Sequence, residues 1–281
     1  MQRGLATTVV LSALGMGSCL MSIDPLVDSK AAGTGGTSLG GDGSIEPDHA
    51  AGGSAGAPTD ADAGCTPTIT PGGAATHSIR ALDSGSISID GDCSEPIWAN
   101  ADTVAFNGQL QSSEAPTLRM FWDPKTGNVY GCLVVSDANL KALANTNDNP
   151  DIYFDDRLEY YLDGDTVPSL DPETVKVYIN AAGNTMDAQF DSTGEQDSKY
   201  VSILGLAAKQ NGTLNQEADT DVGWSAEWYA KVPFAPIVPG QLTRCEFFVA
   251  HEPEALSDVA FGTQINSLDT FGYCRFECPT E

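Results

Sequence analysis

Positive charge is scarce in this sequence. Its 281 residues include 13 lysine and arginine residues against 39 aspartate and glutamate residues, which gives a formal net charge of −26. From residue 77 onward the counts are 11 against 32, and the basic residues form no cluster. Such a surface repels phosphate backbones, so nucleic acid is excluded as a partner. A neutral polyol, or a cation held by carboxylates, remains compatible with it.

Catalytic signatures are also lacking. The chain has three histidines, His49, His77 and His251, and it contains no Gly-x-Ser-x-Gly, His-Glu-x-x-His or phosphate-binding loop. Paired carboxylates occur throughout so acidic a chain, so they do not single out a hydrolase. We therefore expect a protein that is not an enzyme.

No apolar run near the N-terminus is long enough for a transmembrane helix. Residues 5–17 form a short apolar stretch behind Arg3, which is typical of a signal peptide. The stretch ends in Met16-Gly17-Ser18-Cys19, which resembles the bacterial lipobox. The resemblance implies a signal peptide over residues 1–18 and acylation of Cys19, the membrane anchor of an exported lipoprotein. Because Leu20 follows Cys19, we expect the outer membrane, facing the periplasm or the cell surface. An ordinary signal peptide with an incidental cysteine is the alternative.

Residues 19–76 contain almost no aromatic or periodic apolar pattern. Gly, Ala, Ser, Thr, Asp and Pro dominate this segment. Too little apolar surface is available to offset the entropy of ordering, so we predict a disordered tether. A flexible chain of this length spans on the order of 40 Å.

The cysteines agree with export. Of the seven cysteines, the six other than Cys19 are an even number, so in an oxidising compartment all six can pair in disulfides. Sequence alone does not choose the pairing, although Cys65 is expected to pin the tether to the folded body. Zinc at Cys274 and Cys278 is an alternative that lacks a second close ligand pair. The disulfide candidates are Cys65, Cys93, Cys132, Cys245, Cys274 and Cys278.

Residues 77–281 show the alternation of apolar and polar residues that is typical of strands. A helical turn is expected within residues 95–101, and residues 202–209 are ambiguous. Strands separated by turns, with no long amphipathic helix, predict an all-β, antiparallel β-sandwich. The predicted strands lie near residues 87–90, 118–122, 129–135, 158–162, 175–179, 226–230, 245–250 and 271–276.

The order of short motifs over residues 87–276 is similar to that of the family 9 carbohydrate-binding modules. One departure is that Glu227 stands farther from Pro233 than the family's glutamate does, and Tyr229 occupies the nearer position. The motifs are Ile89-Asp90-Gly91 with Trp98, Trp122-Asp123 with Asp137, Asp155-Asp156 with Glu159, Asn180 with Gly183, Gly223-Trp224 with Glu227 and Pro233-Phe234, and Phe271-Gly272.

The resemblance implies a non-catalytic site for a glycan or oligosaccharide. Tyr153 stands where sugar-binding members carry a stacking Trp, and Glu159 matches their hydrogen-bonding Glu. If Leu158, Tyr160 and Leu162 point into the core, their neighbours point outward, and residues 175–179 behave likewise. Trp98, Trp122 and Trp228 are expected in the core. The candidate carbohydrate-binding residues are Tyr153, Glu159, Tyr161, Lys176, Tyr178, Asn180 and Trp224, with Phe261 as another possible stacking ring.

Two other functions remain open. The sandwich could keep the fold without the sugar, with Glu159 serving only the architecture; the chain would then be a structural or protein-interaction lipoprotein of the envelope. A haem-binding relative of the same superfamily would need axial ligands such as Met and His, and Met120 alternates with the apparent core residues.

The acidic loop before Glu159 suggests calcium. Oxygen ligands at alternating positions can surround a hard cation. The loop lacks the glycine and terminal glutamate of an EF-hand, and turn formation explains its Asn, Asp and Pro residues equally well. The candidate ligands are Asp148, Asp151, Asp155 and Asp156. No other cofactor is expected.

Overall fold

The computed structural model describes residues 76–83, 86–106, 115–194, 196–197, 200–252, 256–261 and 270–279. The predicted signal peptide, Cys19, the tether and Cys65 lie outside these residues, so their roles stay predictions. Within the described ranges, no helix has the length and apolar character needed to cross a membrane.

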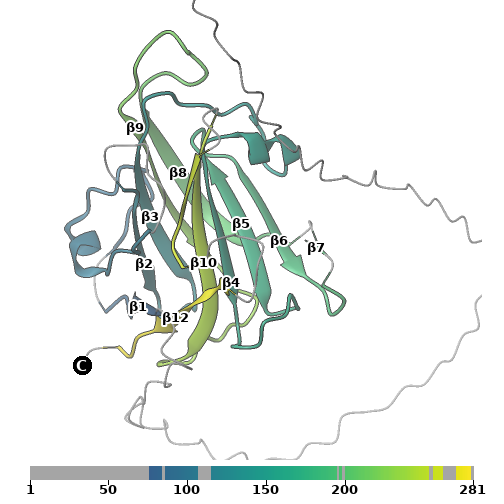
Figure 1. Cartoon of the computed structure of the whole chain (residues 1–281). Helices are drawn as coiled ribbons and strands as arrows, with labels where there is room; N and C mark the ends of the chain where they lie inside the picture. The colour runs from purple at the N-terminus through teal and green to yellow at the C-terminus, as the bar shows by residue number, and fades with distance from the viewer. Residues whose placement is uncertain are drawn as a thin grey trace, which may run out of the picture. The chain divides into compact units, whose positions relative to one another are not determined.

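The described residues form strands joined by loops and two short 3-10 helices (Figure 1). The helices are η2 (Pro96–Asn100) and η3 (Pro150–Phe154). The strands are β1 (Thr76–Ala81), β2 (Thr117–Trp122), β3 (Val129–Ser136), β4 (Arg157–Asp163), β5 (Thr174–Asn180), β6 (Thr185–Phe190), β7 (Gln196–Asp197), β8 (Ile203–Asn211), β9 (Gly223–Ala230), β10 (Leu242–His251), β11 (Leu256–Val259) and β12 (Gly272–Phe276).

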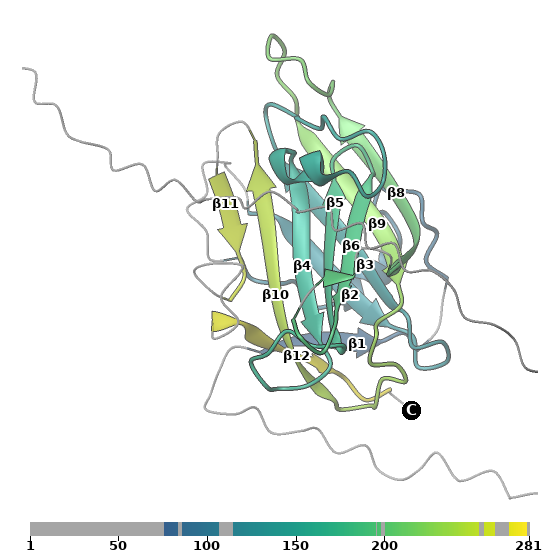
Figure 2. The same cartoon turned by 90° about the vertical axis from the view of Figure 1, so that its right-hand side faces the viewer.

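Two sheets pack face to face. The first, sheet A, has the order β7-β6-β5-β4-β10-β12, and β11 also pairs with β10. The second, sheet B, has the order β2-β3-β9-β8. Neighbours within each sheet are antiparallel, whereas β1 pairs in parallel with both β12 and β2 and so joins the two sheets. Figure 2 shows β10, β4, β5 and β6 in front of β3 and β9. The predicted antiparallel β-sandwich is confirmed.

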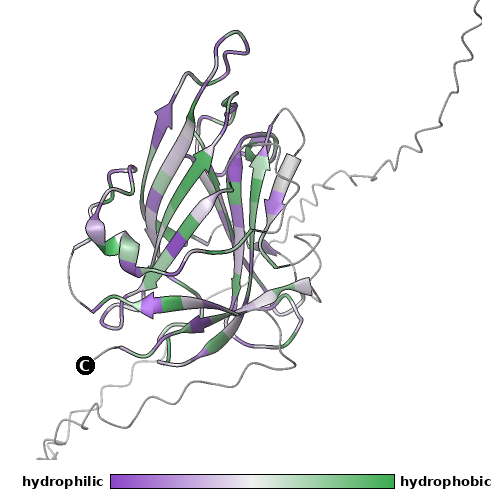
Figure 3. Cartoon of the chain, turned by 60° about the vertical axis from the view of Figure 1, so that its left-hand side comes forward, coloured by the Kyte–Doolittle hydropathy of each residue, from purple (hydrophilic) through white to green (hydrophobic). Residues whose placement is uncertain are grey.

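Alternating residues of both sheets form one buried apolar core. Figure 3 shows hydrophobic and hydrophilic residues following one another along the strands. In β4, Leu158, Tyr160 and Leu162 are buried as predicted, and Tyr160 stacks on Trp228 of β9 with ring centroids 6.0 Å apart. Large aromatic rings of this kind supply much of the buried apolar area of a sandwich core. Trp122 and Trp228 belong to this core, and both predictions are confirmed.

A second, smaller core lies on the outer side of sheet B. Trp98 of η2 packs there against Phe121 and Cys132, so Trp98 is buried as predicted, although not between the sheets. The predicted strand at residues 87–90 is wrong. Its apolar alternation reflects Ile87 packing on this outer core, and side chains, not a neighbouring strand, accept its backbone N–H groups at Ser88 and Asp90.

Two disulfides join described cysteines. Cys93 is bonded to Cys132, which fastens the segment before η2 to β3, and Cys245 of β10 is bonded to Cys274 of β12. Cys278 is disulfide-bonded as well. Because Cys274 and Cys278 are both in disulfides, the alternative of a zinc site at this pair is wrong.

Candidate functional site

The outer face of sheet A brings together most of the predicted carbohydrate-binding residues. Antiparallel pairing places Glu159 opposite Tyr178 and Tyr161 opposite Lys176. The side chains between them in sequence fill the core, so these four share the other face of β4 and β5. Strand parity therefore gives the correct side of the sheet, but all four side chains are buried and not exposed to a ligand.

Glu159 is the centre of this group. Its side chain is buried, and its carboxylate lies 3.0 Å from Lys176 Nζ and 3.8 Å from Arg157 Nη2. Two cationic side chains lie beside a single carboxylate, so the group carries a net positive charge. We call Arg157, Glu159, Lys176, Tyr161 and Tyr178 the Glu159 cluster.

The two tyrosines of the Glu159 cluster remain neutral hydrogen-bonding groups. Burial, followed by the charge of Glu159, raises the pKa of Tyr161 and of Tyr178 well above the ordinary phenol value. Lys176 Nζ lies 5.0 Å from the ring centroid of Tyr161 and 4.7 Å from that of Tyr178, a cation–π arrangement. Burial lowers the pKa of Lys176, and Glu159 opposes this shift.

Tyr153 lies beside the Glu159 cluster on η3. The guanidinium of Arg157 sits 4.5 Å from the Tyr153 ring centroid, and Arg157 Nη1 donates a hydrogen bond of 2.6 Å to the Tyr153 carbonyl oxygen. The Tyr153 side chain is nevertheless 48% exposed, and the adjacent Phe154 is 55% exposed. The arrangement offers an exposed aromatic platform with a cation on its inner side.

Asn180 is placed behind the site instead of on its surface. Its side chain is buried and donates to the carbonyl oxygen of Ala144 and to Asp155 Oδ2. Its own Oδ1 accepts from the Asn184 backbone. Asn180 therefore holds the loop that leads into η3, and direct contact with a ligand is not available to it.

Trp224 requires a correction. Its side chain is 2% exposed and belongs to the core between the sheets, so it cannot offer its ring to a ligand on the outer face. Trp224 follows the same parity as Ala226 and Trp228, which determines its direction. Phe261 is half-buried against Phe247, with ring centroids 6.2 Å apart. Neither the Trp224 ring nor the Phe261 ring therefore provides a second exposed surface on which a sugar could stack.

The structure does not bring the four predicted calcium ligands together. Asp155 accepts hydrogen bonds from the backbone of Leu143 and Ala144, and Asp156 accepts from Lys141 and Glu252. Both carboxylates are buried and stabilise the loop, whereas the other two candidates, Asp148 and Asp151, are exposed. Calcium binding by this set stays a prediction without a preformed cluster behind it.

Sequence reasoning missed Arg157 and Phe154. Arg157 has the same parity as Glu159, so its outward direction was available from the strand pattern. Its stacking on Tyr153 depends on the turn of η3, which the pattern does not contain. Phe154 is the second exposed aromatic residue of that turn.

Comparison with known proteins relates the fold to one group of solved structures. No family model and no curated protein matches the chain. A family 9 carbohydrate-binding module from Caldicellulosiruptor kristjanssonii in complex with cellotriose aligns with a TM-score of 0.52 at 17% identity, over 74% of this chain and 96% of that chain. The domain has the β-sandwich fold of the family 9 carbohydrate-binding modules.

Two further solved structures align with the domain to a similar extent. The C. kristjanssonii module in complex with glucose aligns with a TM-score of 0.51 at 16% identity, over 74% of this chain and 98% of that one. A candidate carbohydrate-binding protein from Bacteroides uniformis aligns with a TM-score of 0.53 at 13% identity, over 73% of this chain and 100% of that one.

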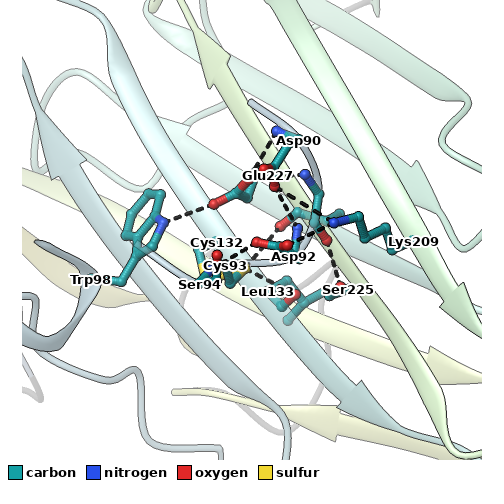
Figure 4. Close-up of a disulfide and its surroundings, with 12 residues drawn as sticks. Asp90, Asp92, Cys93, Ser94, Trp98, Cys132, Leu133, Lys209, Ser225 and Glu227 are labelled. Atoms are coloured by element: carbon teal, nitrogen blue, oxygen red, sulfur yellow. Dashed lines mark hydrogen bonds and ion pairs between the residues drawn. A yellow bond between two sulfur atoms is a disulfide. The ribbon is translucent and has the colours of Figure 1, made fainter. Parts of the chain in front are cut away.

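Within this family 9-like sandwich, Glu227 has an architectural role. One oxygen, Oε2, accepts hydrogen bonds from the backbone of Asp90 and Gly91, and Oε1 accepts from Trp98 Nε1 at 2.8 Å (Figure 4). Glu227 therefore fastens the Ile89-Asp90-Gly91 turn and Trp98 to β9. Residues of the first motif, Asp90, Gly91 and Trp98, therefore meet Glu227 of a later motif on the outer side of sheet B.

Proposed function

We propose that this domain binds carbohydrate without cleaving it, with Tyr153 as the platform and the Glu159 cluster beside it. The observation that carries the proposal is the Tyr153 ring, which has a guanidinium at 4.5 Å and still remains 48% exposed. A sugar ring can stack its C–H surface on the open side. The buried residues of the Glu159 cluster support the platform from behind and do not contact the ligand. The fold shared with modules solved with cellotriose and glucose supports this choice of ligand.

Glu159 acts in this proposal as a positioning residue. Its carboxylate is buried and its ion pairs hold Lys176 and Arg157, and Arg157 in turn supports Tyr153. Loss of the Glu159 charge would release both cations and disturb the platform, even though Glu159 itself does not face the solvent.

We expect Tyr153→Ala to weaken glycan binding at least about tenfold, a loss of roughly 1.4 kcal/mol. Glycan arrays identify a ligand, and titration calorimetry with that ligand measures the affinity. Glu159→Gln should also weaken binding while the fold is retained. Tyr229→Ala is the matched control, because Tyr229 stacks on Tyr130 on the outer side of the other sheet. Absence of any glycan ligand, or unchanged affinity in Tyr153→Ala, rejects the proposal.

A protein-interaction or structural role in the envelope is the second candidate. The observation that favours it is an exposed apolar patch of Tyr153 and Phe154, which are 48% and 55% exposed and whose ring centroids lie 5.7 Å apart. Apolar residues grouped in this way also suit a protein partner. This candidate replaces the first if no glycan binds and the patch residues prove necessary for a complex.

We also propose that the chain is an exported lipoprotein anchored through Cys19. The support is the signal-like N-terminus, the lipobox-like sequence and the disulfides Cys93–Cys132 and Cys245–Cys274, which suit an oxidising compartment. We expect radiolabelled palmitate to be incorporated by the wild-type chain expressed in a Gram-negative host. Cys19→Ser should abolish the label and release the protein from membranes, and equal labelling of both chains would contradict the anchor.

A further inference from the structure

Cys278, near the end of the described chain, has a disulfide partner that the described ranges do not contain. The sequence has seven cysteines, and four of them pair with one another in the two disulfides of the fold. Cys278 is disulfide-bonded as well. Its partner is therefore Cys19 or Cys65, and the place of Cys278 in the fold distinguishes the two.

Cys278 lies beside the C-terminal end of β1. Strand β12 runs parallel to β1 with Phe276 in register with Ile79 (Figure 1), and the backbone N–H of Glu277 donates to the Ile79 carbonyl oxygen. Cys278 follows directly. A chain that leaves Thr76 toward the N-terminus must therefore turn back along β1, by about 13 Å at about 3.3 Å per residue, before it reaches Cys278.

The sequence before β1 favours such a reversal. Pro71-Gly72-Gly73 is typical of a turn, and a proline restricts the residue before it to extended backbone, as Pro67 and Pro71 do here. A chain that turns within this tripeptide and continues extended runs back along β1 and comes level with Arg80 at Cys65. This cysteine therefore arrives next to the end of β12.

Cys19 is the less suitable partner. It would have to close a loop over residues 20–75, whereas Cys65 closes a loop over residues 66–75. Because the probability of closure falls with the 3/2 power of loop length, the shorter loop is favoured by roughly tenfold. This choice does not depend on a lipid at Cys19, although it leaves that thiol available for acylation.

A groove beside β1 lies along the same route. Its volume is about 560 Å³, and Ser78 and Arg80, which alternate with core residues of β1, line it together with Cys278, Asp102 and Phe121. Arg80 Nη2 and Asp102 Oδ1 form an ion pair of 2.9 Å in its wall. Both edges of β1 are already paired, with β12 and β2, so a segment in this groove crosses the strand and does not extend a sheet.

The segment Thr66-Pro67-Thr68-Ile69-Thr70 has a composition that suits this groove. It carries no charge, so it can enter without competing for the ion pair of the wall. Its threonine hydroxyls can donate to and accept from the polar groups there. Ile69 can bury apolar surface against Leu82 and Ile97, which also line the groove.

We propose that Cys65 and Cys278 form a disulfide and that residues 66–70, which we call the strap, lie in this groove across β1. Bond formation joins the two Sγ atoms and passes two electrons and two protons to the disulfide of a thiol–disulfide oxidoreductase, which becomes a dithiol. The chain before Cys65 is then attached to the domain at two points, at the start of β1 through residues 66–75 and at the end of β12 through Cys278.

Trypsin gives a direct test of the bond, because cleavage puts Cys278 on a peptide without another cysteine, residues 276–281. Mass spectrometry of the alkylated, unreduced full chain, exported from a Gram-negative host, should find this peptide linked to residues 31–80, which carry Cys65. Reduction should separate the two peptides. A link to the peptide of Cys19, or an alkylated Cys278, overturns the proposal.

Melting temperatures test whether the two cysteines act as one unit. Cys65→Ser, Cys278→Ser and the double variant should all lower the melting temperature by the same amount, roughly 5–10 °C, because each loses the same bond. Cys19→Ser is the matched control and should keep both the linked peptides and the wild-type melting temperature. Additive losses in the double variant, or a wild-type melting temperature in Cys65→Ser, contradict the pairing.

Hydrogen exchange followed by mass spectrometry tests the position of the strap. Backbone amides of residues 66–70 should exchange more slowly in the wild type than in Cys278→Ser, and more slowly than those of residues 33–57 in the predicted tether. Equal exchange of residues 66–70 in the two chains overturns their placement in the groove.

Discussion

Replacing Glu227 with alanine is expected to lower the free energy of unfolding by about 3–5 kcal/mol, among the largest effects of a single substitution in this domain. The change removes the acceptor of three hydrogen bonds at once, from the backbone of Asp90 and Gly91 and from Trp98 Nε1. A buried donor left without an acceptor costs about 1–3 kcal/mol, so the losses accumulate. No packing compensates, because the carboxylate lies between the loop and β9.

Urea denaturation followed by tryptophan fluorescence measures this loss. Glu227→Gln retains an amide oxygen that can accept from one side of the loop, so its cost should be clearly smaller than that of alanine. Glu217→Ala is the surface control, because Glu217 is exposed and should change stability by less than about 0.5 kcal/mol. A wild-type denaturation midpoint in Glu227→Ala would show that the loop is held by other contacts.

A second large effect is expected at His251. Its imidazole lies between two carboxylates, with Nδ1 3.0 Å from Asp137 Oδ2 and Nε2 3.1 Å from Asp258 Oδ2. All three residues are buried. His251→Phe keeps a planar ring of similar size and leaves both carboxylates without their shared partner, so we expect a loss of about 3–5 kcal/mol at slightly acidic pH.

The pH dependence of stability shows whether His251 stabilises the fold in its charged or in its neutral form. Burial alone would lower the pKa of His251, but the hydrogen bonds to Asp137 and Asp258 outweigh burial and raise the pKa above its ordinary value. The stabilisation from charged His251 is therefore fully present below about pH 6.5 and is lost as the pH rises through the folded-state pKa. The difference between wild type and His251→Phe should shrink as the pH rises above about 6.5.

Unfolding by urea at several pH values checks this expectation. Asp156, whose pKa burial raises to about 8 and the charge of His251 lowers, titrates in the same range, so the difference between the two chains reports on His251 together with its coupling to Asp156. His77→Phe is the contrast, because burial lowers the pKa of folded His77 to about 4 while unfolded His77 titrates near its ordinary value, so its difference from wild type should change with pH in the opposite direction. A pH-independent difference for His251→Phe would contradict the charged Asp–His–Asp arrangement.

Strand parity accounts for what the sequence predicted correctly. The alternation in β4 and β5 determined which side chains fill the core and which form the Glu159 cluster, because the side-chain period of a strand is two. The same rule contradicts Trp224 as a sugar-binding residue, since Trp228 of the same parity was already expected in the core. The motif resemblance led to Trp224; the strand geometry places it inside.

The parts that could not be predicted depend on contacts between distant segments. Pairing of Cys93 with Cys132 requires the loop before η2 to lie on β3, which no local pattern contains. Residues 203–209 of the ambiguous segment belong to β8, an edge strand whose half-exposed side chains make the alternation less regular. The segment around Ile87 shows the reverse case, because it alternates like a strand while side chains satisfy its backbone.

The position of β1 has a mechanical consequence. A pull on the chain from its N-terminal side loads β1 along its own axis, and its parallel neighbours β12 and β2 share that load in shear. From β12 the force passes through β10 to β4, the strand that carries Glu159. The Cys245–Cys274 bond crosses between β10 and β12 on this route, so a covalent link reinforces the path by which a ligand held at the outer face of sheet A would resist tension.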